Sequence, residues 1–331
     1  MHKEIELKLV TYKAAMSHFV AEVLPGLDIE HRHKTLLSNT YFDTAEGRLN
    51  AKRMALRVRN KEGIYIQTLK TKGESVAGLH QRNEWEWNIP MAKLDADLLA
   101  QTPWPDDISV SEVLPVFETN FQREAVVVLY AGARIELACD EGLIKAGDRS
   151  QSLCEIELEL LEGGAESLFA LAKWIATAIP VFPGNVSKAE QGYRLGPLPI
   201  PGFKPRCTMV SRLDALAEPL IDDAIANWQA GMEHFIFSND LDAHFEAMQA
   251  LIVLKAVVTH LVDNKLNDKD QLLEALQASL LILRAAGNRV AHQKLCGRDA
   301  LLPILLEGNH AGISAIALGE WMYLRGRDQK C

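Results

Sequence analysis

Charged side chains alternate with apolar ones in the first ten residues of the chain. Glu4, Glu6 and Lys8 are separated by Ile5 and Leu7. Because alternate side chains of a β-strand lie on one face, the three charges would point together. Two carboxylates about 7 Å apart in a concave site require a cation, which is either a basic side chain or a hard metal ion with oxygen ligands. The spacing therefore predicts one wall of a cation-binding site.

The same alternation returns near residue 155, where three glutamates occupy every second position. In other segments, basic residues occupy alternate positions in the same way, either as pairs two residues apart or singly. For any one strand, a solvated antiparallel sheet explains such a pattern. Closing the sheet would instead bring acidic and basic faces into one lumen, which suits a polyphosphate with its metal. The residues that carry the pattern are Glu155, Glu157 and Glu159, with Arg57, Arg59, Lys70, Lys72 and Arg82.

Composition limits the classes of partner. The chain has 331 residues and a formal net charge of −9, so we expect no nucleic-acid partner, which would usually require a basic surface. It contains no run of about 18 apolar residues, and we expect no membrane partner. Five cysteines without C-x-x-C spacing favour the cytoplasm over an oxidising compartment.

Short alternating segments fill the first half of the chain, and helical spacing fills the second. Four prolines within residues 197–205 separate the halves and predict a stiff linker. We therefore expect an α+β fold with three parts, namely residues 1–197, a linker over 198–206, and an all-α helical bundle over 207–331. Strands are expected at 3–10, 38–43, 54–60, 64–72, 81–89, 121–130, 133–140 and 153–161, and helices at 12–24, 165–178, 270–286 and 298–325.

Six motifs occur in a fixed order over the first 197 residues. Together they resemble the CYTH superfamily, the triphosphate tunnel metalloenzymes, and they look most similar to its bacterial inorganic triphosphatases. The motifs are Glu4-x-Glu6-x-Lys8, Tyr41-Phe42-Asp43-Thr44, Leu56-Arg57-Val58-Arg59, Thr68-Leu69-Lys70, Glu155-Ile156-Glu157-Leu158-Glu159 and Ser187-Lys188.

The resemblance implies an eight-stranded antiparallel β tunnel that binds a linear triphosphate with Mg²⁺ or Mn²⁺. Carried over by motif, the catalytic residues would be Glu4, Glu6, Lys8 and Lys188. Lys188 is expected to handle protons through a pKa lowered by neighbouring cations. The metal would be held by Glu4, Glu6, Glu155, Glu157 and Glu159. Phosphate oxygens would be held by Lys8, Arg57, Arg59, Lys70, Lys72, Arg82, Arg123 and Lys188.

In this family a helical CHAD domain often follows the tunnel, and residues 225–229 resemble its start. Residues 207–331 are about half as long as a full domain of that kind and lack its basic, histidine-bearing face. We therefore expect a truncated, CHAD-like bundle that packs, regulates or forms a homodimer.

The resemblance leaves the nucleophile open. The leading hypothesis is a metal-dependent triphosphatase that hydrolyses tripolyphosphate to pyrophosphate and phosphate. The alternative is a class IV-type adenylate cyclase, in which the ribose 3′-hydroxyl of ATP attacks the α-phosphate. Thiamine triphosphate hydrolysis and a polyphosphate sensor without turnover are further hypotheses. The predicted phosphate-binding and metal-binding residues would serve both the triphosphatase and the cyclase. The four carboxylates of Glu4, Glu6, Glu155 and Glu157 argue against the sensor, since binding of an anion alone gains nothing from them.

Overall fold

The computed structural model describes residues 2–71, 73–76, 78–197, 203–207, 217–260, 269–292, 295 and 297–328. Lys72 lies outside the described residues, and so do residues 198–202 of the expected linker.

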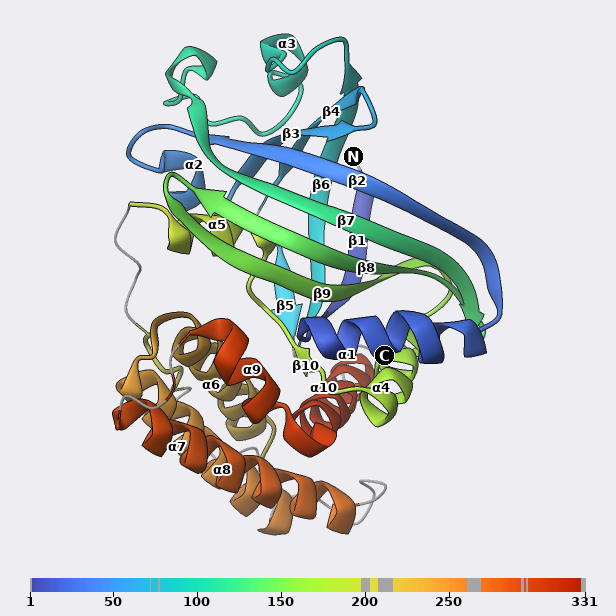
Figure 1. The fold of residues 1–331 in the computed structure, drawn as a ribbon, viewed down its shortest axis with the longest axis vertical. Helices are drawn as coiled ribbons and strands as arrows, with labels where there is room; N and C mark the ends of the chain where they lie inside the picture. Colours follow the sequence, from blue (N-terminus) through green and yellow to red (C-terminus); the bar gives the residue numbers. More distant parts are fainter. Residues whose placement is uncertain are drawn as a thin grey trace.

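Eight strands close into an antiparallel barrel, which confirms the expected fold (Figure 1). Around the barrel the order is β1-β9-β8-β7-β2-β3-β4-β6, and β6 pairs with β1 to close it. Two short strands extend the edges, β5 (Glu74–Val76) on β6 and β10 (Phe182–Pro183) on β1. The barrel strands are β1 (His2–Val10), β2 (Ile29–Asp43), β3 (Ala55–Lys61), β4 (Ile64–Lys70), β6 (Leu79–Ile89), β7 (Leu114–Tyr130), β8 (Ala133–Ala146) and β9 (Arg149–Glu162).

Strand β2 is longer than its sequence pattern indicates. It begins at Ile29 rather than at residue 38, because its first half pairs with β7 along an exposed stretch of the hairpin. Residues 30–34 are all polar and exposed, so they show no alternation of apolar and polar side chains that could mark a strand.

Apolar side chains of β1, β8 and β9 point out of the barrel and are covered by helices. Leu7, Leu9 and Ile156 are fully buried in one core with α1 (Lys13–His18) and α4 (Glu166–Ala178). A π-helical turn (Phe19–Val23) and a 3-10 turn (Leu24–Gly26) continue α1. The charged residues of these strands therefore face the lumen. The smaller helices are α2 (Arg48–Ala51), α3 (Ala96–Leu99), a 3-10 turn (Val110–Glu112) and α5 (Lys188–Leu195).

The second half of the chain is helical, as expected. Its helices are α6 (Ala217–Ser238), α7 (Leu241–His260), α8 (Lys269–Ala291), α9 (Arg298–Leu305) and α10 (His310–Asp328), with a 3-10 turn (Glu307–Asn309) between the last two. The single helix expected over 298–325 is wrong, because Gly308 takes a φ of 70° and the chain bends by 54°. Trp228 and Phe235 lie in the core of this region.

The last helix packs both in the bundle and on the tunnel (Figure 1). Ala315 and Leu318 of α10 are fully buried in the core of the helical region. Ile316 of α10 is fully buried in the same core as α4. Glu320 of α10 forms an ion pair with Lys173 of α4 at 2.6 Å. Gly312 allows the close approach, since a Cβ there would lie 2.2 Å from the Val181 carbonyl oxygen.

Within the part of the chain that the structure describes, no single helix has the length and apolar character needed to cross a membrane. The bent pair Arg298–Leu305 and Glu307–Arg325 meets these criteria only when its two helices are taken together.

Candidate active site

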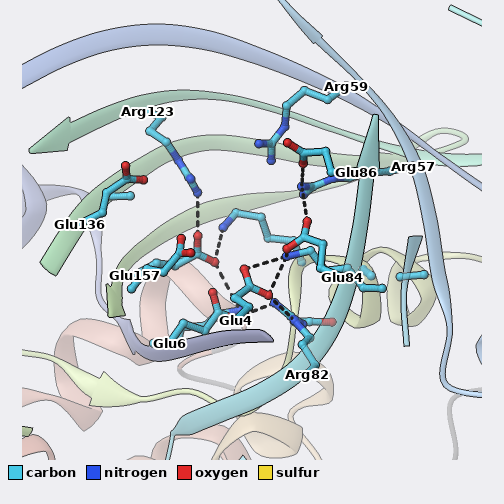
Figure 2. Close-up of a pocket in the computed structure, with 18 of the residues that line it drawn as sticks. Glu4, Glu6, Arg57, Arg59, Arg82, Glu84, Glu86, Arg123, Glu136 and Glu157 are labelled. Carbon is cyan, nitrogen blue, oxygen red and sulfur yellow. Dashed lines mark hydrogen bonds and ion pairs between the residues drawn. The ribbon is translucent and has the colours of Figure 1, made fainter. Parts of the chain in front are cut away.

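A cavity of about 500 Å³ occupies the tunnel, and charged side chains surround it (Figure 2). Its walls come from all eight barrel strands, and the N-terminal end of α5 closes one end. Its lining comprises Glu4, Glu6, Lys8, Tyr41, Ala55, Arg57, Arg59, Lys70, Arg82, Glu84, Glu86, Arg123, Glu136, Ala138, Glu157, Glu159, Ser187, Lys188 and Ala189.

Lys188 enters this closed end from the first turn of α5. Ser187 caps the helix by accepting a hydrogen bond from the Glu190 N–H at 3.1 Å. The Lys188 ammonium lies 2.7 Å from Asp140 and 2.8 Å from Glu157, and it also contacts Glu155. The buried lysine is therefore surrounded by carboxylates.

These carboxylates overturn the expected protonation behaviour of Lys188. Burial alone would lower its pKa, but Asp140, Glu155 and Glu157 outweigh burial and raise the pKa well above its usual range. The expectation of a lowered pKa is therefore wrong. It rested on the cations of the motifs, whereas the acidic residues lie closer to Lys188.

Arg123 completes the same cluster from β7. Its guanidinium donates to both oxygens of Asp140 at 2.7 Å and to Glu157 at 2.6 Å. Opposing burial, these pairs raise the pKa of Arg123 and, together with Lys188 and Lys8, depress the pKa of Glu157. Lys8 lies farther off, 3.6 Å from Glu155 and 3.8 Å from Glu157.

Asp140, Glu155 and Glu157 also have the spacing of metal ligands, because their nearest oxygens all lie within 4.8 Å of one another. We call these three residues the paired cluster, since Lys188 and Arg123 already neutralise them.

A second set of carboxylates lies on neighbouring strands and is much less neutralised. Strand pairing places Glu159 of β9 directly opposite Glu6 of β1 and Glu136 of β8. We call Glu6, Glu159 and Glu136 the acidic row. Like charges placed directly opposite repel each other. Burial raises the pKa of Glu159 to about 7, with further contributions from Glu4 and Glu136. Among the described residues, no basic group lies within 4 Å of Glu159.

Glu4 adjoins the acidic row and is better compensated. Lys70 donates to its carboxylate at 2.9 Å, and Arg82 donates to Glu4 at 2.9 Å and to Glu6 at 2.6 Å. Burial would raise the pKa of Glu4, but Lys70 and Arg82 lower it to about 2. Lys70 also lies 3.1 Å from Glu84.

Two arginines of β3 form the opposite, basic wall of the cavity (Figure 2). Arg57 reaches Glu84 only at 3.7 Å, and its buried Nε has no hydrogen-bond partner. Arg59 donates to Asn39 at 2.8 Å, and no carboxylate of the described residues lies within 4 Å of it. Burial, then repulsion by Arg57 and Arg123, lowers the pKa of Arg59 to about 9. This wall is suited to an added anion.

The structure brings the described predicted site residues together in the tunnel. All line the cavity except Glu155, which is fully buried behind Lys188 and accepts a hydrogen bond from Gln191 at 3.4 Å. The prediction for Lys72 falls outside the described residues. Sequence reasoning assigned no role to Glu84, Glu86, Glu136 and Asp140, although their alternation with apolar residues marks the same inner face. Tyr41 belongs to the motif Tyr41-Phe42-Asp43-Thr44, but sequence reasoning assigned it no role in the site.

Comparisons with known proteins agree with this architecture. Residues 2–193 match the CYTH domain. The inorganic triphosphatase of Haemophilus influenzae is 33% identical over 199 residues, which are 59% of this chain and 56% of that protein. The chain therefore matches little more than half the length of that curated relative.

Two solved structures are also similar. A Hippeastrum protein, described as an adenylyl cyclase with a dominant triphosphatase activity, has a TM-score of 0.44 and 22% identity. The alignment covers 57% of this chain and 95% of that one. A Bacillus halodurans protein, described as a candidate adenylate cyclase, has a TM-score of 0.36 and 22% identity, with coverage of 54% and 94%.

Proposed function

Because the chain belongs to the CYTH family, we propose that it is a metal-dependent inorganic triphosphatase. It would hydrolyse tripolyphosphate to pyrophosphate and phosphate inside the tunnel. The observation that carries the proposal is the pair of opposed walls, one with the incompletely paired Arg57 and Arg59 and the other with the acidic row. A linear polyanion with a divalent ion would satisfy both walls at once.

The few uncharged residues that line the cavity favour a substrate without a nucleobase. Of the described lining residues, only Ala55, Ala138, Ala189 and Tyr41 have apolar or aromatic side chains. The Tyr41 ring is 4% exposed and stacks on Phe117, with 4.5 Å between ring centroids. A nucleobase would therefore find little surface to stack on, which supports tripolyphosphate over ATP.

We assign the divalent ion to the acidic row together with Glu4 and Glu157. The residues fit a hard cation, because the partly buried Glu159 lies opposite two carboxylates without a basic partner among the described residues. The oxygen donor set agrees with Mg²⁺ or Mn²⁺. When bound, such an ion neutralises phosphate charge and lowers the pKa of coordinated water. Glu155 stays a predicted ligand, although its carboxylate is already engaged by Lys188.

The basic residues would bind and orient the substrate. Arg57 and Arg59 lack close carboxylate partners and would hold phosphate oxygens directly. Lys188 remains protonated because of its carboxylate neighbours, so it would donate hydrogen bonds to a phosphate rather than accept a proton from water. The buried, unpaired thiols of Cys139 and Cys154 support the cytoplasm as the location.

Product identification tests the function. Purified protein is incubated with tripolyphosphate or ATP, with Mg²⁺ or Mn²⁺ or with a chelator, and the products are separated. We expect pyrophosphate and phosphate from tripolyphosphate, and their loss with the chelator. Cyclic AMP from ATP, with little phosphate from tripolyphosphate, would establish the cyclase instead. Tight binding without turnover would indicate a sensor.

A further inference from the structure

A short loop joins the tunnel to α5, the helix that closes one end of the cavity, and this loop contacts the helical region. Residues 183–186 end two positions before Lys188. Glu233 of α6 accepts hydrogen bonds from the backbone N–H groups of Asn185 at 2.6 Å and Val186 at 3.0 Å. One carboxylate oxygen of the helical region therefore holds two successive amides of the loop.

A second side chain of α6, one helical turn earlier, holds the rest of the loop. Gln229 is 1% exposed, donates to the Pro183 carbonyl at 3.2 Å and accepts from the Asn185 side chain at 2.9 Å. Because Gln229 and Glu233 are four residues apart, they lie on one face of α6. This face therefore contacts both ends of the loop.

The tunnel holds the same loop from the opposite side. The Gly184 N–H donates to the Lys8 carbonyl at 3.0 Å, and His80 bonds the Gly184 carbonyl at 3.0 Å. A Cβ at Gly184 would lie 2.7 Å from a Val10 methyl group, so the loop fits tightly against β1. Its position is thus determined jointly by the strand that carries Glu4, Glu6 and Lys8 and by α6.

We propose that Glu233 and Gln229 are positioning residues for the tunnel reaction. They fix the loop, the loop fixes the start of α5, and α5 presents Lys188 to the substrate. The helical region would then complete the closed end of the site, although none of its side chains that the structure describes lines the cavity. The inference rests on the proposed triphosphatase function for its kinetic readout, while its structural readout is independent of that function.

Kinetics of three variants separate positioning from simple domain docking. Glu233→Ala removes both acceptor bonds, and we expect kcat/KM for tripolyphosphate to fall at least about tenfold. Glu233→Gln keeps an oxygen that can accept both N–H groups, and it should restore kcat/KM to within about twofold of wild type. Glu320→Ala breaks the α10–α4 ion pair, a second contact between the two regions, and should leave kinetics unchanged. Wild-type kinetics in Glu233→Ala would overturn the proposal.

Hydrogen–deuterium exchange supplies the independent readout. Glu233→Ala should accelerate exchange in a peptide that covers residues 184–192, whereas Glu320→Ala should not. Gln229→Leu is the second variant, in case Glu233→Ala does not fold. It keeps the volume of the side chain and removes the bonds to the Pro183 carbonyl and the Asn185 side chain, so it should also accelerate exchange in this peptide. If wild type fails to hydrolyse tripolyphosphate, the proposed function is wrong, and the exchange experiment still decides the positioning. Unchanged exchange in both Glu233→Ala and Gln229→Leu would refute the positioning role of Glu233 and Gln229.

Discussion

The tunnel holds two acidic sites that differ in how far the chain itself neutralises them. In the paired cluster, Asp140, Glu155 and Glu157 receive Lys188 and Arg123 at short distances. In the acidic row, Glu159 lies between two carboxylates, and no basic group of the described residues is within 4 Å of it. The paired cluster is thus compensated internally, whereas the acidic row is compensated only in part, through the contact of Arg82 with Glu6.

The same contrast separates the arginines. Arg123 has a bidentate carboxylate partner, whereas no carboxylate of the described residues lies within 4 Å of Arg59, which donates to an amide oxygen. A buried charge without a partner is costly, so its retention indicates that a ligand supplies the missing charge. We infer that Arg123 and Asp140 mainly maintain the closed end of the tunnel. Arg57 and Arg59 would bind the triphosphate, and the acidic row would bind the metal together with Glu4 and Glu157.

The largest effect is expected in the acidic row. Glu6→Gln should lower turnover of tripolyphosphate about 1000-fold, because it removes a metal ligand worth several kcal/mol of charge stabilisation. Folding should persist, since the amide oxygen can still accept the hydrogen bond from Arg82. Phosphate release and circular dichroism measure the two quantities. Glu118→Gln, on the exposed face of β7, is the control. Wild-type turnover in Glu6→Gln would remove Glu6 from the metal site.

Breaking the paired cluster should instead cost stability. Arg123→Ala leaves Asp140, which is fully buried, with Lys188 as its remaining cation. The free energy of unfolding should fall by about 3 kcal/mol, the lower end for a broken buried pair, because Arg123 keeps some exposure. Urea denaturation measures it. Arg134→Ala, which breaks an exposed pair with Glu30, should change stability little. Equal losses of unfolding free energy in Arg123→Ala and Arg134→Ala would show that the paired cluster contributes no more to stability than an exposed ion pair.

In contrast to Arg123, Arg59 should affect substrate binding more than stability. Arg59→Ala should raise KM about tenfold to hundredfold through the loss of a charged hydrogen bond to phosphate. Its free energy of unfolding should stay near the wild-type value or rise, since an uncompensated buried cation is removed. Steady-state kinetics and urea denaturation on the same preparation test both halves. An unchanged KM would show that Arg59 does not bind the phosphate oxygens of the substrate.

The smallest effect concerns the ionisation of Glu159 without metal, which burial and then the neighbouring carboxylates Glu4 and Glu136 make unfavourable. The pKa of Glu159 rises from 4.5 to about 7 on folding, so its ionisation destabilises the folded protein progressively as pH increases through that window. Glu159→Gln should therefore raise the free energy of unfolding by about 1–3 kcal/mol at pH values above 7 in chelator. The gain should vanish at pH values below 4.5. A gain that is independent of pH would show that the ionisation of Glu159 is not its cause.

Much of the tunnel could be predicted from the sequence because strand parity is local. Alternation alone placed Glu4, Arg57 and Glu157 on inner faces, and the eight expected strands all form. The strand register is not local. The alignment of Glu6 with Glu159 and Glu136 depends on the pairing of β1 with β9, which are about 150 residues apart in sequence, so the acidic row could not be recognised beforehand.

The two wrong predictions have different origins. The pKa of Lys188 depends on Asp140 and Glu155, whose approach is decided by the docking of α5 and not by any motif. The break in the last helix did carry a sequence signal, because Gly308-Asn309 is a turn-forming pair. The surrounding apolar periodicity, which continues into α10, obscured it.

The path of α10 has a consequence for synthesis of the protein on the ribosome. Ile316 completes the apolar layer over α4, yet it lies about 150 residues after Glu162, where the last strand of the barrel ends. The strands of the tunnel are thus made long before this covering is complete. A nascent chain that reaches only to the linker would expose apolar surface over α4, and this surface is covered only once α10 has emerged.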